Sequence, residues 1–243
     1  MSRLLEKDFA RLETFLSQYS MAEVLTSKAR EQLVKRGHKF SLAALQVWAS
    51  ADQLAQAGQL KLKGVDLAND TPHFEQLAES FSDLISAFFA ALHGLYKPAH
   101  MSLRSAIETF VRGLAGLNSG EAASTKNVYR LFEIASDGAV FQGAAKPHFD
   151  RIYQEYGALC GYTHSATPAH MIKNYAMSSF PKQDIEHLRV WVRHCEAVIK
   201  AMLAILIYAD RALYLRATAN AQDVYEETIP KEARLFALGA PAK

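Results

Sequence analysis

The sequence predicts an all-α protein, built as an antiparallel helical bundle. Apolar residues recur at spacings of three and four along most of the 243 residues, which is the spacing of a helix face. Glycine and proline number only 12 and 7 while half of the residues are hydrophobic, a composition that favours long helices. One compact domain is the simplest organisation. We expect N-terminal helices (residues 1–58) to pack on a bundle (residues 73–217), with a short charged tail (residues 218–243) after it.

Charge and cysteine content narrow the class of protein. The net charge is +2 and the isoelectric point is near 8.4, so binding to nucleic acid would need a local basic patch. Cys160 and Cys195 are too few for a disulfide framework, which suits a reducing compartment. Frequent charges at the N-terminus argue against a signal peptide, and the apolar run at 198–209 is shorter than the roughly 20 residues that span a bilayer. We therefore expect a cytoplasmic protein without a membrane segment.

Three helices are expected in the N-terminal segment. The first is amphipathic and covers about the first twenty residues. Ser20 is a candidate N-cap for a second helix, which Gly37 would end. A third helix occupies residues 41–58, from Ser41 as N-cap to Gly58 as stop. Residues 59–72 are the one plausible non-helical insert, either a loop or a short hairpin.

The bundle itself begins with a helix over residues 73–96. Pro98 interrupts the pattern and is expected in the first turn of the next helix, which gives a two-helix hairpin with a tight corner. A loop at 118–127 leads to a short helix, and a further helix covers residues 148–166. The last large helix is expected from about 182 to 217.

A polar stripe follows the helix after Pro98. Arg104, Glu108 and Arg112 are four residues apart, and His100 precedes them by one turn, so all four lie beside the apolar face. One interpretation is a ladder of ion pairs, each worth about 0.3–0.5 kcal/mol when exposed. The other is an arginine that its acidic neighbour orients to bind phosphate, since the flanking residues are small enough to let a phosphate approach.

A second group of polar residues closes the helix at 148–166. Tyr156, Cys160 and Thr163 follow one helical face, and His164 stands where the helix should stop. A histidine in this position can be a C-terminal cap that the helix dipole stabilises. Its other interpretation is a general acid or base, for which its titration near neutral pH is suited.

Two motifs of the chain resemble those of a bacterial branch of the HEPN superfamily. They are Leu103-Arg104-Ser105-x-x-Glu108 and Tyr156-x-x-Leu159-Cys160-x-x-x-His164. The resemblance covers roughly residues 75–210. HEPN proteins are helical bundles of toxin–antitoxin, abortive-infection and CRISPR-linked systems, and their active members are metal-independent ribonucleases. The resemblance implies a homodimer that acts on RNA without a cofactor and pairs with an antitoxin or a defence-system partner.

The resemblance also implies roles for individual residues. In HEPN ribonucleases an arginine and a histidine from each protomer meet at the dimer seam. Carried onto this chain, His164 would be the general acid or base and Arg104 would stabilise the charge on the phosphorane. Glu108 would orient Arg104. The residues expected to bind substrate are Tyr156, Tyr162, Arg112 and His100.

The chain departs from the HEPN pattern in one respect. Active members carry R-x4–6-H within one short segment, and no arginine stands at that distance before His164. The literal match is Arg189 with His194, an alternative catalytic pair, although about one such match is expected by chance. A second function therefore stays open: a non-catalytic bundle that binds itself, a partner protein, RNA or a nucleotide. No metal site is expected, because the histidine pairs lack the four-residue spacing of a helix-borne zinc site.

Overall fold

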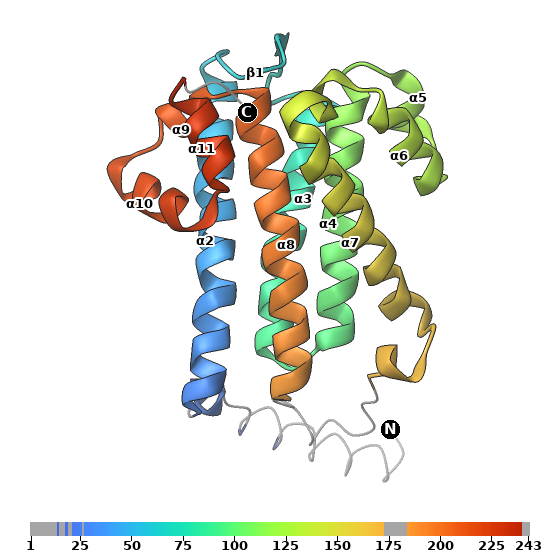
Figure 1. Cartoon of the computed structure of the whole chain (residues 1–243). Coiled ribbons are helices and arrows are strands. Elements are labelled where there is room, and N and C mark those ends of the chain that lie inside the picture. Colours follow the sequence, from blue (N-terminus) through green and yellow to red (C-terminus); the bar gives the residue numbers. More distant parts are fainter. Residues whose placement is uncertain (1–13, 15–17, 19–20, 26, 173–183, 240–243) are drawn as a thin grey trace.

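The computed structural model describes residues 14, 18, 21–25, 27–172 and 184–239, and it confirms the all-α class (Figure 1). Five long helices of this described chain lie side by side and alternate in direction (Figure 1). They are α2 (Lys28–Gln56), α3 (Pro72–Leu92), α4 (Tyr96–Gly116), α7 (Lys146–His164) and α8 (Ile185–Ala209). None of the described helices is long and apolar enough to cross a membrane.

Short elements connect and cover these helices. Residues 59–72 are the expected non-helical insert, and of its two alternatives the structure has the short hairpin: β1 (Lys61–Leu62) and β2 (Val65–Asp66) pair antiparallel, with Lys61 opposite Asp66. The connection from α4 to α7 contains α5 (Gly120–Ser124), α6 (Val128–Ser136), η2 (Ala139–Phe141) and η3 (Gly143–Ala145). The others are η1 (Ala22–Leu25), η4 (Pro168–His170), α9 (Ala212–Leu215), α10 (Ala219–Thr228) and α11 (Lys231–Ala237).

Side-chain caps fix where several helices begin. Thr71, Asn127 and Asp184 each accept a hydrogen bond from a backbone N–H in the first turn of α3, α6 and α8, respectively. A cap of this kind typically stabilises a helix by about 1 kcal/mol. Pro98 lies in the first turn of α4, as predicted, where its missing N–H removes no helical hydrogen bond.

The expected helix end at Gly37 is wrong, because α2 is continuous through this position and also through Ser41. Gly37 is buried where α2 approaches α3 and α8. A Cβ atom there would stand 3.2 Å from the Phe88 ring and 3.3 Å from the Trp191 ring. The glycine thus permits close packing of three helices. The predicted stop at Gly58 is confirmed, whereas the predicted opening helix and its neighbour Ser20 lie almost wholly outside the described residues.

The C-terminal region is more structured than the sequence indicated. The predicted helix over residues 182–217 is shorter, because α8 ends at Ala209 and Asp210 takes an extended conformation. The Asp210 carboxylate accepts backbone hydrogen bonds from Ala212 at 2.8 Å and Lys61 at 3.1 Å, which connects this turn to the hairpin. The expected tail carries α10, which packs on α2, and α11, which packs on α8.

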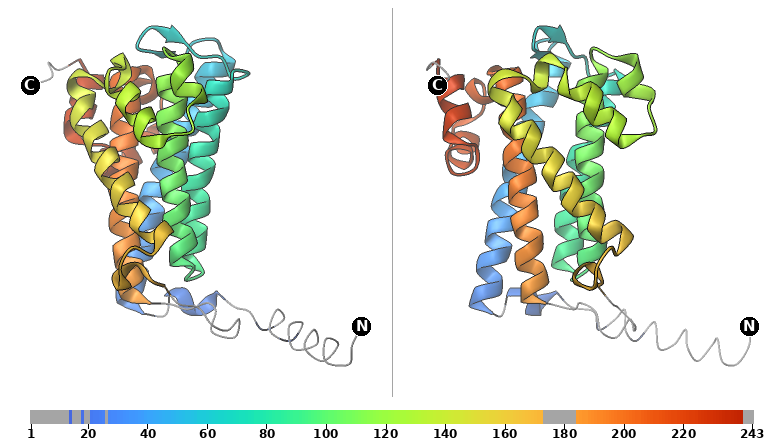
Figure 2. Two further views of the ribbon diagram at one scale, coloured as in Figure 1. Left: turned by 90° about the vertical axis from the view of Figure 1, so that its right-hand side faces the viewer. Right: turned by 45° about the vertical axis from the view of Figure 1, so that its right-hand side comes forward.

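Helix α7 crosses the bundle diagonally (Figure 2). Its first half lies against α8, and its last turns lie against the beginning of α4. The contact at the lower end is polar: the Lys97 amine donates to the Ser165 hydroxyl at 2.9 Å. This path gives α7 one side that faces α4 and another that faces α8, and both sides carry polar side chains.

Two glycines inside long helices provide a matched test of this packing. We expect Gly157→Ala to raise the free energy of unfolding by about 0.5–1 kcal/mol, because alanine favours helix and a Cβ at this exposed position meets nothing within 4 Å. Gly113→Ala should lower it by about 1 kcal/mol, since its Cβ would stand 3.0 Å from the carbonyl oxygen of His73. Urea unfolding followed by tryptophan fluorescence measures both. Equal stabilisation by the two substitutions would contradict the close contact of α3 with α4.

Candidate functional site

The polar stripe predicted on the helix after Pro98 lies along one flank of α4. The apolar face beside it is fully buried and includes Leu103, Ile107 and Phe110. Arg104 and Glu108 keep about a quarter of their side-chain surface exposed, at 26% and 27%. The stripe therefore borders the core and still reaches solvent.

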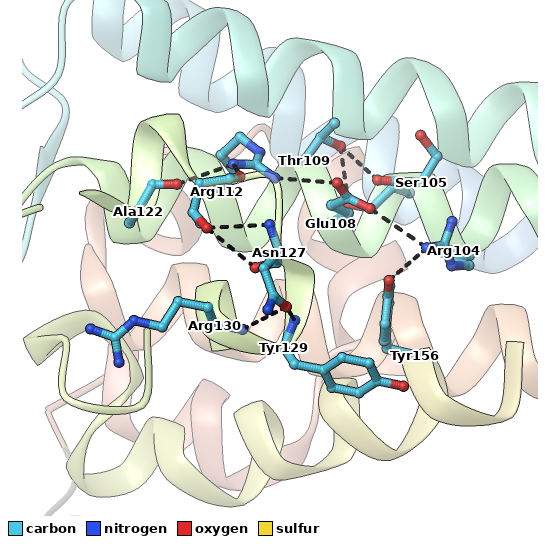
Figure 3. Close-up of polar contacts among 12 residues, drawn as sticks. Arg104, Ser105, Glu108, Thr109, Arg112, Ala122, Asn127, Tyr129, Arg130 and Tyr156 are labelled. Carbon is cyan, nitrogen blue, oxygen red and sulfur yellow. Dashed lines mark hydrogen bonds and ion pairs between the residues drawn. The ribbon is translucent and has the colours of Figure 1, made fainter. Parts of the chain in front are cut away.

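Arg104 is held by two residues of α7. Its Nη2 donates to the Tyr156 hydroxyl at 2.6 Å (Figure 3). Its Nε donates to the Cys160 sulfur at 3.4 Å. The guanidinium carbon also lies 4.9 Å from the centre of the Tyr156 ring, within the range of a cation–π contact. Glu108 approaches the same guanidinium at 3.9 Å. The structure therefore brings together three of the predicted site residues, Arg104, Glu108 and Tyr156.

The protonation of this pair follows from its surroundings. Burial alone would lower the pKa of Arg104, but the hydrogen bonds with Cys160 and Tyr156 raise it, so the guanidinium stays charged. Burial raises the pKa of Tyr156 to about 12, and nearby Arg104 opposes that rise only in part. Tyr156 is thus a neutral phenol that accepts from Arg104 and still has its own hydrogen to donate. Such a pair offers several donors to a phosphate oxygen.

Arg112 lies in a clamp and not on an open surface (Figure 3). Its guanidinium is paired with Glu108 at 3.2 Å. It also donates to the backbone carbonyls of Ala122 at 3.2 Å and Thr125 at 2.7 Å. The sequence predicted Arg112 as a substrate ligand, whereas the structure uses its donors to hold the α5–α6 connection against α4.

His164 is the last residue of α7 and is exposed. Ser165, directly after it, takes the left-handed conformation of a C-cap with φ 49°. Tyr156, Cys160 and His164 are spaced by four residues, so they follow one side of α7, and Arg104 contacts the first two. Among the described residues, no hydrogen bond or ion pair joins His164 to Arg104 or Glu108. The three predicted catalytic residues border the same seam between α4 and α7. His164 lies one helical turn after Cys160, which contacts Arg104.

His100 and Tyr162, two predicted substrate ligands, lie in the interior. Their rings stack in parallel with centroids 3.8 Å apart, and the His100 Nδ1 is 2.6 Å from the carbonyl oxygen of Tyr96. His100 is completely buried and Tyr162 is 8% exposed. The packing of α4 against α7 therefore keeps both rings away from a ligand at the surface.

The alternative catalytic pair is split between two sides of α8. Five residues correspond to about 140° of helix rotation, and Arg189 is accordingly exposed and paired with Glu186. His194 points inward, where its Nδ1 lies 2.6 Å from the Glu155 carboxylate. The other oxygen of Glu155 is 2.6 Å from Arg151. Arg189 and His194 thus do not form one site.

Glu155 links Arg151 to His194 through two polar contacts, and the sequence analysis did not predict this arrangement. Glu155 is buried, and both of its carboxylate oxygens have a cationic or donor partner. The four-residue spacing of Arg151 and Glu155 could have predicted the ion pair between them. The contact between Glu155 and His194 joins α7 to α8 across 39 positions, so no local sequence pattern predicts it. Within the described part of the chain, no group of three or more metal-ligating side chains could hold a metal ion.

The Arg112 clamp can be tested directly. We expect Arg112→Ala to lower the free energy of unfolding by about 1.5–3 kcal/mol, because two part-buried carbonyl groups would lose a charged donor. Arg112→Lys should recover only part of this, since an ammonium cannot reproduce the forked geometry. Hydrogen exchange should quicken first at the amides of α5 and α6. Unchanged exchange there would contradict the clamp.

His100 should make stability depend on pH. Burial lowers its pKa to about 3, whereas a histidine in the unfolded chain titrates near 6.5. Between these values the unfolded state binds a proton that the folded state does not, so stability falls as pH falls below 6.5. From pH 7 to pH 5 the expected loss from His100 is about 2 kcal/mol.

Urea unfolding at pH 7 and pH 5 checks this pH dependence. His100→Gln should reduce the difference in the free energy of unfolding between the two pH values. Some dependence should remain, because burial also lowers the pKa of His148, although Glu232 opposes this. An unchanged slope in His100→Gln would show that His100 does not carry the effect.

Comparison of the chain with protein-family models, with curated proteins and with solved structures finds no match. The function of the α4–α7 seam has to be inferred from its own residues.

Proposed function

We propose that the chain is a HEPN-like, metal-independent ribonuclease that acts on RNA at the α4–α7 seam as a homodimer. The observation that carries the proposal is the arrangement of Arg104. Its guanidinium is charged, partly exposed, and fixed by Tyr156, Cys160 and Glu108. An arginine whose orientation is set before the ligand arrives binds phosphate with less loss of side-chain entropy.

The reaction that fits these residues is transesterification within RNA. A base removes the proton of the ribose 2′-hydroxyl, whose oxygen attacks the adjacent phosphorus. The bond to the 5′-oxygen breaks, an acid protonates that oxygen, and a 2′,3′-cyclic phosphate remains. Arg104 stabilises the negative charge on the phosphorane, and the Tyr156 hydroxyl donates to one of its oxygens. His164 takes or gives the proton.

A second protomer supplies what one chain lacks. The reaction needs a base on one side of the phosphate and an acid on the other, and among the described residues the exposed histidine of each seam is His164. Pairing of two seams would place two His164 side chains and two Arg104 side chains around one phosphate. The resemblance of the motifs adds the biological setting that we propose: a cytoplasmic toxin or phage-defence effector with a cognate antitoxin or defence-system partner.

A non-catalytic binding module is the second candidate, and one observation favours it. The Nη2 and Nε donors of Arg104 are already occupied within the chain, and no hydrogen bond or ion pair joins His164 to Arg104 in the described part of the structure. In that case Arg104 and Tyr156 serve to fix α4 against α7. The bundle would then bind itself, a partner protein, RNA or a nucleotide without turnover.

The deciding experiment is cleavage of total RNA and of short oligonucleotides in the presence of EDTA. We expect wild-type protein to cleave, His164→Ala to be slower by a factor of about 10²–10⁴, and Arg104→Ala to be slower by about 10²–10³. Arg189→Ala is the matched control, because Arg189 is exposed on α8 outside the seam. Circular dichroism and gel filtration establish that each variant is folded and show its oligomeric state.

Other outcomes separate the two candidates. Inert wild-type protein that binds RNA or forms a stable dimer would support the binding module and remove the ribonuclease. Cleavage that EDTA abolishes, or that His164→Ala retains in full, would contradict the proposed chemistry at this seam.

A further inference from the structure

A basic cavity of about 390 Å³ opens on the other side of α7, between α2, α7 and α8. The turn between α10 and α11 contributes Pro230 to its rim. Four cationic side chains line it, and they come from three helices. They are Arg36 of α2, Arg151 of α7, and Arg193 and Lys200 of α8.

The cations of this cavity outnumber its carboxylates. Arg36 and Lys200 share one partner, Glu196, with Arg36 Nε and Lys200 Nζ each 2.6 Å from its oxygens. Arg151 pairs with Glu155. Arg193 has no ion-pair partner among the residues that the structure describes, and its side chain is exposed. The four cations thus share two directly paired carboxylates, which leaves the cavity lining with an excess of positive charge.

Glu196 does not neutralise the cavity by taking up a proton. Burial alone would raise its pKa, but hydrogen bonds from Lys200 and Arg36 lower it, so the carboxylate is ionised and orients these two cations. His148 also lines the cavity, and burial lowers its pKa. The uncharged imidazole has one ring nitrogen that donates a hydrogen bond and one that accepts.

The floor of the cavity is small and apolar. Ala197 and Ala201 lie one turn apart on α8 and line the cavity together with Arg193 and Lys200 of the same helix. Their short side chains take up little of the space between the longer cationic side chains that line the cavity. His148 supplies the one aromatic ring among the described lining residues, so the cavity offers charge without a platform for stacking a nucleobase.

We propose that this cavity binds a compact polyanion with two or three linked phosphate groups. Cations from three helices converge on it, and a di- or triphosphate carries enough charge and enough acceptor oxygens to meet several of them together. The cavity is separate from the α4–α7 seam. Arg151 and Cys160 are nine residues apart on α7, which places them on opposite sides of the helix.

Isothermal titration calorimetry of the full chain with inorganic pyrophosphate and inorganic triphosphate, near 0.15 M salt, tests this site. We expect saturable binding to the wild type. Arg193→Gln should weaken binding at least about tenfold, because it removes a cation that has no acidic partner among the described residues. No carboxylate of the described chain loses a partner in this variant. Ala197→Glu should abolish binding, since it places a negative charge on the floor. Arg189→Gln is the matched control on the same helix and should bind like the wild type.

Comparison of ATP with inorganic triphosphate identifies the source of the phosphates. Equal affinity means that the phosphates alone are recognised, and tighter binding of ATP means that the nucleoside is bound as well. Absence of saturable binding by wild-type protein would overturn the proposal. Equal weakening by Arg193→Gln and Arg189→Gln would overturn it too, because it would show diffuse attraction to a basic surface.

Discussion

The arrangement of this bundle depends on the burial of α8, whose second half is apolar on every side. From Val198 to Ala209 every residue except Lys200 is buried. A helix of this kind has to be enclosed by other elements, since each square ångström of exposed apolar surface costs about 25 cal/mol. The helices that contact it include α2, α4, α7 and α11. The polar residues of α8 are thereby confined to its first half and to one flank, where Arg193, Glu196 and Lys200 border the basic cavity.

The diagonal path of α7 determines which polar groups can act together. Near its start it lies against α8, and near its end it lies against α4. Residues on one side of α7, Tyr156 and Cys160, therefore meet Arg104, whereas Arg151 on the opposite side faces the cavity. Opposite sides of α7 thus contribute to two charged sites, the α4–α7 seam and the basic cavity. Neither requires the other, so phosphate binding in the cavity and RNA cleavage at the seam are independent proposals.

Short sequence patterns predicted the features that depend on interactions between residues close in sequence. The helices that follow Thr71 and Pro98, the hairpin at 59–72 and the contact of Arg104 with Glu108 depend on neighbours in sequence, and each was predictable. The helix end predicted at Gly37 is wrong because the same residue type serves two purposes. A glycine can end a helix, and it can also leave room for neighbouring rings, here Phe88 and Trp191. The burial of His100 and the bond from Glu155 to His194 depend on how α4, α7 and α8 rotate against one another. Patterns of neighbouring residues do not determine how these helices rotate against one another.

The buried polar contacts explain why α7 has one position against its neighbours. Apolar packing alone tolerates many combinations of side chains and gives up uniqueness before stability. A shift of α7 by one turn would move Tyr156 away from Arg104 and Glu155 away from His194, and would leave charged or polar groups buried without partners. A buried donor or acceptor that loses its partner costs about 1–3 kcal/mol. These contacts therefore fix the register that places His164 at the seam and Arg151 at the cavity, and both proposed sites depend on it.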